Sequence, residues 1–88
     1  MKSIRRTTQF KKDVRKVQRR GKNLDKLKKA ITLLLSGNPL PPRLRDHELT
    51  GPWKGTRNLH LEPDWLLLYE MDGDELVLIR TGSHADLF

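Results

Sequence analysis

The 88-residue chain contains no cysteine. This absence excludes disulfide bridges, thiolate metal sites and a cysteine nucleophile, and it fits a reducing compartment. Long apolar runs are also missing, because the apolar stretches, such as residues 33–35 and 65–69, are far too short to cross a bilayer. The first six residues carry charge with no apolar run behind them, so they do not form an export signal. We therefore expect a cytoplasmic protein with no membrane partner.

The short length leaves room for a single domain over residues 1–88. A chain of this size buries only roughly 60–65% of the surface that its unfolded form exposes, so a second hydrophobic core is excluded. No internal repeat or low-complexity segment breaks the sequence.

Positive charge is concentrated in the first part of the chain. Residues 1–30 hold thirteen basic and two acidic residues, a net charge of +11, whereas residues 31–88 hold five basic and nine acidic residues, a net charge of −4. Such a basic segment attracts polyanions by neutralising phosphates and releasing counterions. The charge alone is equally compatible with a solvated lysine-rich surface.

Two helices are predicted in this basic part. Thr7 or Thr8 can cap a first helix, whose apolar residues recur at helical spacing before Gly21 ends it. Asn23 can cap a second helix that ends near residues 36–39. A basic helical hairpin also suggests a helix-turn-helix DNA reader, as an alternative.

Strands surround the helices. A short edge strand is predicted over residues 2–7, and three further strands over residues 53–61, 64–71 and 75–81, with an irregular loop at 40–51. The predicted order is therefore βααβββ. Because the apolar strands need cover, we expect an α+β fold in which a small antiparallel sheet packs against an N-terminal helical hairpin.

The polar residues that such a fold does not require lie in the second half, and they include all three histidines. They are Asp46, His47, Lys54, Arg57, His60, Asp64, Arg80, His84 and Asp86. His60 ends one predicted strand, Asp64 begins the next and His84 follows the last. In an antiparallel meander these three positions lie at the same end of the sheet, so their side chains are expected to converge.

Histidine and aspartate suit the cleavage of RNA by its own 2′-hydroxyl. That reaction needs a base for the 2′-oxygen, cations on the phosphate and an acid for the leaving 5′-oxygen. An imidazole titrates near about pH 6.5 and can serve as either base or acid. Lys54, Arg57 and Arg80 can hold the phosphate.

Other interpretations of these residues stay open. Histidines and an aspartate can bind zinc, but no closely spaced pair of the H-x-x-x-H kind is present, so no metal is assigned. Trp53 and Trp65 fit core packing, although an exposed Trp65 would suit base stacking. The terminal Phe88 either docks near the site or frays.

Several motifs resemble the YafQ branch of the RelE superfamily of bacterial toxins, over essentially the whole chain. They are residues 27–35, DHELTG-x-WKG at 46–55, RNLHLEPDW at 57–65 and RTGSHADLF at 80–88. The resemblance implies a small sheet with a helical hairpin, and metal-independent, cofactor-free cleavage of messenger RNA on the ribosome. The family's functional positions match six residues here: His47, His60, Asp64, Trp65, His84 and Phe88. Asn58 departs from relatives that carry an acid there.

The same resemblance suggests roles and partners. Asp64 with His60 would activate the 2′-hydroxyl, His84 would protonate the leaving oxygen, and His47 would hold the phosphate. A cognate antitoxin would cover the basic surface, and the N-terminal half would contact ribosomal RNA. Two alternatives are a ParE-like toxin that binds DNA gyrase without catalysis, and an RNA- or ribosome-binding module that does not cut.

Overall fold

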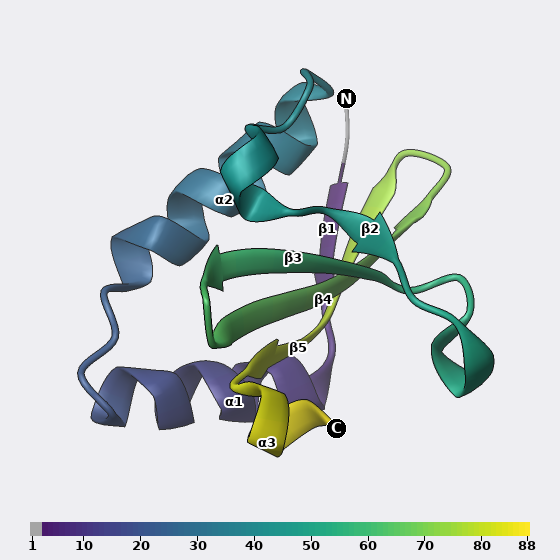
Figure 1. Cartoon of the computed structure of the whole chain (residues 1–88). Coiled ribbons are helices and arrows are strands. Elements are labelled where there is room, and N and C mark those ends of the chain that lie inside the picture. The colour runs from purple at the N-terminus through teal and green to yellow at the C-terminus, as the bar shows by residue number, and fades with distance from the viewer. Residues whose placement is uncertain (1–2) are drawn as a thin grey trace.

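The computed structural model describes residues 3–88 and consists of a five-stranded sheet with helices (Figure 1). The elements are β1 Ser3–Arg6, α1 Thr8–Arg19, α2 Leu24–Ser36, η1 Pro42–Leu44, β2 His47–Glu48, η2 Gly51–Trp53, β3 Arg57–Glu62, β4 Trp65–Asp72, β5 Glu75–Gly82 and α3 His84–Leu87. Lys2, predicted as the first residue of the edge strand, lies outside the described residues. The predicted α+β class is confirmed.

The sheet is mixed, which corrects the antiparallel sheet expected from the sequence. Its strand order is β1-β5-β4-β3-β2, with β1 at one edge as predicted. β1 pairs with β5 in parallel, whereas the β3-β4-β5 meander and the β2-β3 pair are antiparallel. The parallel pair forms because α1 and α2 carry the chain across the sheet before the meander begins.

The first two helices begin where the sequence predicts. The Thr7 side chain accepts a hydrogen bond from the Phe10 N–H at 3.0 Å, and Asn23 accepts one from the Asp25 N–H at 2.9 Å. α2 ends at Gly37, whose φ of 73° is left-handed and suits glycine. Figure 1 shows that α1 and α2 diverge instead of running side by side. An apolar groove of about 320 Å³ lies between them.

Different elements pack against the two faces of the sheet. One face packs against α1 and α2 through the main core, which contains Leu59, Leu67 and Tyr69 of the sheet. The other face carries a smaller cluster in which Leu66 and Leu68 contact Leu87 of α3. Because side chains alternate along a strand, Asn58 and His60 share this second face with the smaller cluster. The fold thus leaves one face free to carry polar groups.

Four short elements were absent from the prediction, η1, η2, β2 and α3, and the last two bear on the site. Residues 47–48 were expected in a loop but pair with β3 as strand β2, which places His47 opposite Asn58. Residues 84–87 form the short helix α3, capped by Ser83. Both elements carry a histidine, so both determine where the imidazoles lie. In the described part of the chain, no helix is long and apolar enough to cross a membrane.

Candidate active site

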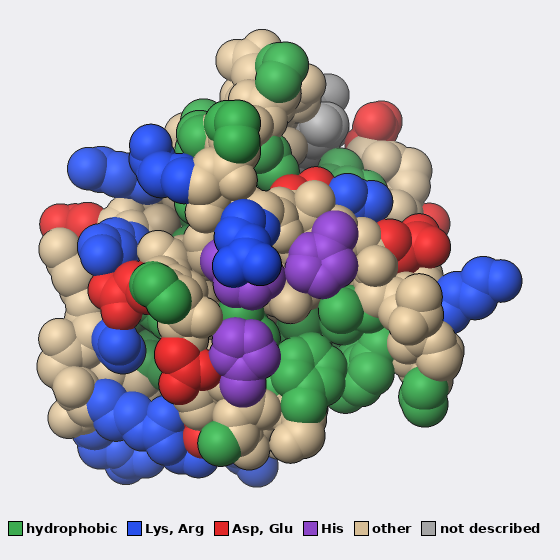
Figure 2. All heavy atoms as spheres, viewed as in Figure 1, with side chains coloured by type: hydrophobic (Ala, Val, Ile, Leu, Met, Phe, Trp, Pro, Cys, Tyr) green, Lys and Arg blue, Asp and Glu red, His purple; other side chains and the backbone are tan. Residues whose placement is uncertain are grey.

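The three histidines lie together on the sheet face that α1 and α2 leave open (Figure 2). His60 is in the middle: its ring centroid lies 5.9 Å from that of His47, with the planes 27° apart, and 6.1 Å from that of His84. The three rings come from β2, β3 and α3. The predicted convergence of His60, Asp64 and His84 at one end of the sheet is therefore confirmed, and His47 joins them from β2.

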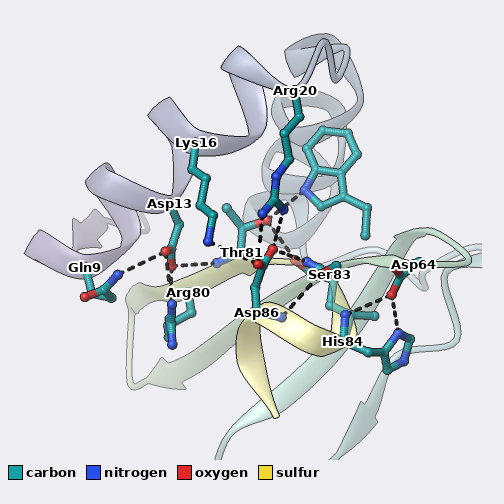
Figure 3. A network of polar contacts seen from close by, with 12 residues as sticks. Gln9, Asp13, Lys16, Arg20, Asp64, Arg80, Thr81, Ser83, His84 and Asp86 are labelled. Atoms are coloured by element: carbon teal, nitrogen blue, oxygen red, sulfur yellow. Dashed lines mark hydrogen bonds and ion pairs between the residues drawn. The ribbon is translucent and has the colours of Figure 1, made fainter.

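His84 is held by Asp64. One carboxylate oxygen of Asp64 accepts hydrogen bonds from the backbone N–H of His84 at 2.8 Å and from its ring Nδ1 at 2.6 Å (Figure 3). The His84 hydrogen bonds hold the pKa of this carboxyl below its usual range. The ring therefore carries its Nδ1 proton toward Asp64 and presents Nε2 to the open face.

The His47 ring is oriented by the backbone of Arg45, two residues earlier in the chain. Its Nδ1 lies 2.8 Å from the carbonyl oxygen of Arg45. Since a carbonyl only accepts, Nδ1 carries the hydrogen and Nε2 is left as the acceptor in the neutral ring. The ring itself is exposed.

His60 is buried, with 8% of its surface exposed. Its Nδ1 has no hydrogen-bond partner among residues 3–88, and the same is true of Oδ1 of the buried Asn58, two residues earlier on β3. Burial lowers the pKa of His60, and the nearby Arg45, His47 and His84 lower it further. His60 is thus neutral at physiological pH. Unpaired buried polar atoms of this kind are uncommon outside functional sites.

The two arginines predicted to bind phosphate are already paired. Arg57 binds Asp46 with a closest N–O distance of 2.7 Å, and the Tyr69 hydroxyl donates to the same carboxylate. Arg80 binds Asp13 of α1 through two nitrogens, each at 3.1 Å (Figure 3). Burial and the Asp46 hydrogen bond raise the pKa of Tyr69, so its hydroxyl stays protonated. Both guanidinium groups are therefore bound to carboxylates of the protein and are not free for a phosphate.

Trp65 corrects a prediction, because it is 1% exposed and cannot stack on a base. Its Nε1–H donates to the Thr81 hydroxyl at 2.9 Å inside the main core. Phe88 is 58% exposed and lies edge-on to Trp53, with ring centroids 5.9 Å apart. Lys54 is exposed at the end of η2, before β3 begins, and forms no ion pair with a described residue. Of the predicted aromatic contacts, Phe88 is the accessible one.

Sequence reasoning missed one acidic residue that links the sheet to α1. Asp13 is a buried acid, 4% exposed, which accepts from Arg80 and from the Thr81 N–H. The sequence did indicate this position. Asp13 is an acid in a strongly basic helix, and its spacing of three residues from Phe10 and four from Val17 places it on the buried side. Asp86, expected among the polar residues that the fold does not require, instead forms a second structural link by accepting from Arg20 and Lys16 of α1 (Figure 3).

A metal centre is not supported by the donor geometry. Among residues 3–88, no group of three or more histidine, aspartate or glutamate side chains is arranged to hold a metal ion. Hydrogen bonds instead orient His47 and His84 separately, through the Arg45 carbonyl and the Asp64 carboxylate. What the arrangement can do chemically is accept and donate protons at three neighbouring rings.

Comparison with known proteins identifies the family. The family model described as "Bacterial toxin of type II toxin-antitoxin system, YafQ" matches residues 2–88. The mRNA interferase toxin YafQ of Escherichia coli K12 is 48% identical over 81 residues, which cover 91% of this chain and 88% of that protein. The crystal structure of YafQ from E. coli BL21(DE3) is 44% identical, with a TM-score of 0.94 and coverage of 100% of this chain and 99% of that one.

A second solved structure shows a relative with its partner. YafQ in the E. coli DinJ-YafQ complex is 45% identical, with a TM-score of 0.92, and covers 100% of this chain and 99% of that one. Family model, sequence identity and fold agree over nearly the whole length. This chain therefore belongs to the YafQ family of bacterial type II toxin-antitoxin toxins.

Proposed function

We propose that this toxin is an endoribonuclease that cleaves messenger RNA on the ribosome, in the cytoplasm, by acid-base catalysis without a metal or other cofactor. The observation that carries the proposal is the row of three imidazoles on the open face, one of them bound to Asp64. The mRNA interferase activity named for the E. coli relative supports it.

The environments of the rings suggest a division of roles. His60 is buried and its pKa is lowered, so it is neutral and suited to take the proton from the 2′-hydroxyl. The 2′-oxygen then bonds to phosphorus as the bond from phosphorus to the 5′-oxygen breaks. His84 supplies the proton that the 5′-oxygen takes up. Asp64 orients His84, and its negative charge compensates that of the protonated imidazole.

This division modifies the role expected for Asp64. From the family resemblance, Asp64 is expected to activate the 2′-hydroxyl together with His60, whereas its hydrogen bonds lead to His84. In its protonated form, His47 would hold the phosphate through Nε2, which then donates a hydrogen bond, while Nδ1 stays on the Arg45 carbonyl. Phe88 provides an exposed ring for a base.

The remaining assignments concern more distant contacts. Lys54 is free to bind phosphate. Arg57 and Arg80 chiefly stabilise the fold, through their ion pairs with Asp46 and Asp13. The basic N-terminal half would contact ribosomal RNA, where dense positive charge favours binding. A cognate antitoxin is expected by analogy with the DinJ-YafQ complex.

A cleavage assay on ribosomes carrying a defined message tests the proposal. Wild-type protein should cut the message when a chelator selective for transition metals is present and the Mg²⁺ that ribosomes need is kept, and His84→Gln should reduce the rate about 100- to 10,000-fold, the usual contribution of a general acid. Asp72→Asn is the matched control, because Asp72 is an exposed acid at the distant β4-β5 turn. Binding to ribosomes without any cleavage by the wild type would contradict the enzymatic role.

A further inference from the structure

Two of the three cations that the sequence suggested for the phosphate are already paired, and the third, Lys54, does not line the cavity that holds His60. The Arg57 guanidinium is bound to Asp46 and the Arg80 guanidinium to Asp13. Attack on a phosphodiester builds negative charge on the phosphate oxygens, which a nearby cation stabilises. A paired guanidinium supplies less of this stabilisation than a free one. A different basic residue is therefore needed close to His60.

Arg45 meets this need by its position. It directly follows η1 and precedes Asp46 and His47 in the chain. Its φ of 48° lies in the left-handed region, and it is the one residue other than glycine with a positive φ among residues 3–88. Such a backbone conformation costs roughly 1–2 kcal/mol and is often kept at functional sites. The strained residue also provides the carbonyl that fixes His47.

The side chain of Arg45 is available for a ligand. It is exposed and forms no ion pair in the part of the chain that the structure describes. It lies close enough to His60 for its charge to lower the pKa of that ring. Arg43, two residues earlier, is also exposed and unpaired within residues 3–88.

A cavity joins these arginines to His60. Its walls include Arg43, Arg45, His60 and Pro63, and its volume is about 260 Å³. Pockets for drug-sized ligands span roughly 300–1,000 Å³, so this one suits a single nucleotide unit. The acid on its wall, Glu62, is already bound by Lys22 and Lys26 at 2.7 and 2.8 Å. The cavity therefore presents uncompensated positive charge beside a buried histidine with an unpaired nitrogen.

We propose that Arg45 binds a phosphodiester of the RNA chain in this cavity, next to His60, and that Arg43 lies at its outer rim. The proposal rests on the RNA-cleaving function and adds the residue that grips the phosphate. Arg45 then has two effects: its backbone orients His47, and its guanidinium holds the phosphate on which the histidines act.

Substitutions at Arg45 separate these effects. Arg45→Gln removes the charge while keeping a side chain at the same positive φ, and Arg45→Lys keeps the charge but not the two-pronged geometry. On ribosomes carrying a defined message, Arg45→Gln should lower the cleavage rate roughly 10- to 100-fold, the usual effect of losing a charged hydrogen bond. Arg45→Lys should recover part of that loss. Arg43→Ala, the matched control in the same loop, should lose less.

A readout independent of cleavage keeps the test decisive. NMR titration should show that Arg45→Gln raises the His60 pKa and that Arg43→Ala changes it less. Uridine 3′-monophosphate should bind the wild type with shifts at His60, and Arg45→Gln should weaken this binding at least about 10-fold. Thermal melts identify any variant that fails to fold, in which case Arg45→Asn, which also removes the charge and tolerates a left-handed backbone, replaces Arg45→Gln in both measurements.

The outcomes distinguish the two proposals. If the wild type cleaves RNA and Arg45→Gln cleaves equally fast with equal nucleotide binding, the phosphate role of Arg45 is wrong and the nuclease proposal stands. If the wild type does not cleave but binds the nucleotide through Arg45, the subsite stands and the nuclease proposal fails. Binding at a surface away from His60, unaffected by Arg45→Gln, also overturns the subsite.

Discussion

Asp64 binds His84 twice through a single oxygen, once at the backbone N–H and once at ring Nδ1. The first bond fixes the start of α3 and the second fixes the ring, so the helix and its imidazole cannot rotate independently. Ser83 and Asp86 complete the start of the helix with a capping box. His84 is therefore positioned by the chain around it before any substrate binds.

Removing the Asp64 carboxylate should impair cleavage more than folding. In Asp64→Ala, His84 loses both hydrogen bonds, and we expect the cleavage rate to fall roughly 10- to 100-fold while the melting temperature changes little, because the side chain is exposed. The rate on ribosomes and a thermal melt check this together. An unchanged rate, or a loss that follows unfolding alone, would contradict the positioning role.

His60 should titrate below an ordinary histidine. Its lowered pKa means that the unfolded chain binds more protons than the folded protein near pH 6.5, so His60 makes stability rise with pH there. The contribution is present above the unfolded pKa of about 6.5 and is lost as the pH falls through the lower folded value. NMR titration of the ring checks the direction. A pKa at or above about 6.5 would remove the argument that His60 is the neutral base.

Trp65 should matter for stability. Trp65→Phe removes the hydrogen bond to Thr81 and leaves space in the main core, so we expect a loss of about 1–3 kcal/mol in the free energy of unfolding. Urea unfolding measures this loss. At a temperature where the variant is folded, its cleavage rate should stay within about 10-fold of the wild type, since no base stacking is removed. A much larger rate loss in the folded variant would restore the stacking role.

Asp86 should contribute to stability at neutral pH. Hydrogen bonds from Arg20 and the Ser83 N–H hold its pKa well below the usual range. This stability is present above the unfolded pKa of about 3.9 and is lost as the pH falls below it. Because Arg20 and Lys16 are partly exposed, we expect Asp86→Asn to cost roughly 1–2 kcal/mol at pH 7. In urea unfolding, the variant should approach the wild type near pH 2; an equal difference at pH 7 and pH 2 would contradict this.

Gly82 offers a second test of the Asp86 link. A Cβ added at Gly82 would lie 2.8 Å from the Asp86 carboxylate oxygen Oδ2, closer than real contacts allow. Gly82→Ala should therefore push Asp86 from its partners and reduce the same pH-dependent stability. The matched control is Gly55→Ala, where the added Cβ meets no atom within 4 Å and only the positive φ is penalised.

The sequence predicted the elements that carry strong local signals. Helix caps at Thr7 and Asn23 and the apolar strands of the meander have side-chain patterns that depend on neighbours in the chain. The parallel pairing of β1 with β5 joins residues about 70 positions apart and leaves no such pattern. Strand β2 has two residues and α3 has four, too few for a periodicity to show.

The positions of His60 and His84 in the site were predictable from the sequence. Which basic residues stay unpaired was not. The turn at residues 63–64 and the antiparallel meander place His60, Asp64 and His84 at one end of the sheet, so convergence follows from topology. Which cations stay free depends on pairings across the fold, such as Arg80 with Asp13, which no spacing shows. The same limitation hid Arg45, whose importance comes from its left-handed backbone and from the cavity beside His60.

The chemistry of the fragment ends tests the central claim most directly. Attack by the 2′-oxygen leaves a 2′,3′-cyclic phosphate on the upstream fragment and a 5′-hydroxyl on the downstream one. We predict these ends when the wild-type protein cuts a ribosome-bound message with Mg²⁺ kept for the ribosome and transition metals removed by a selective chelator, and their loss in His84→Gln. Fragments with a 3′-hydroxyl and a 5′-phosphate, which require attack by water, would contradict the account.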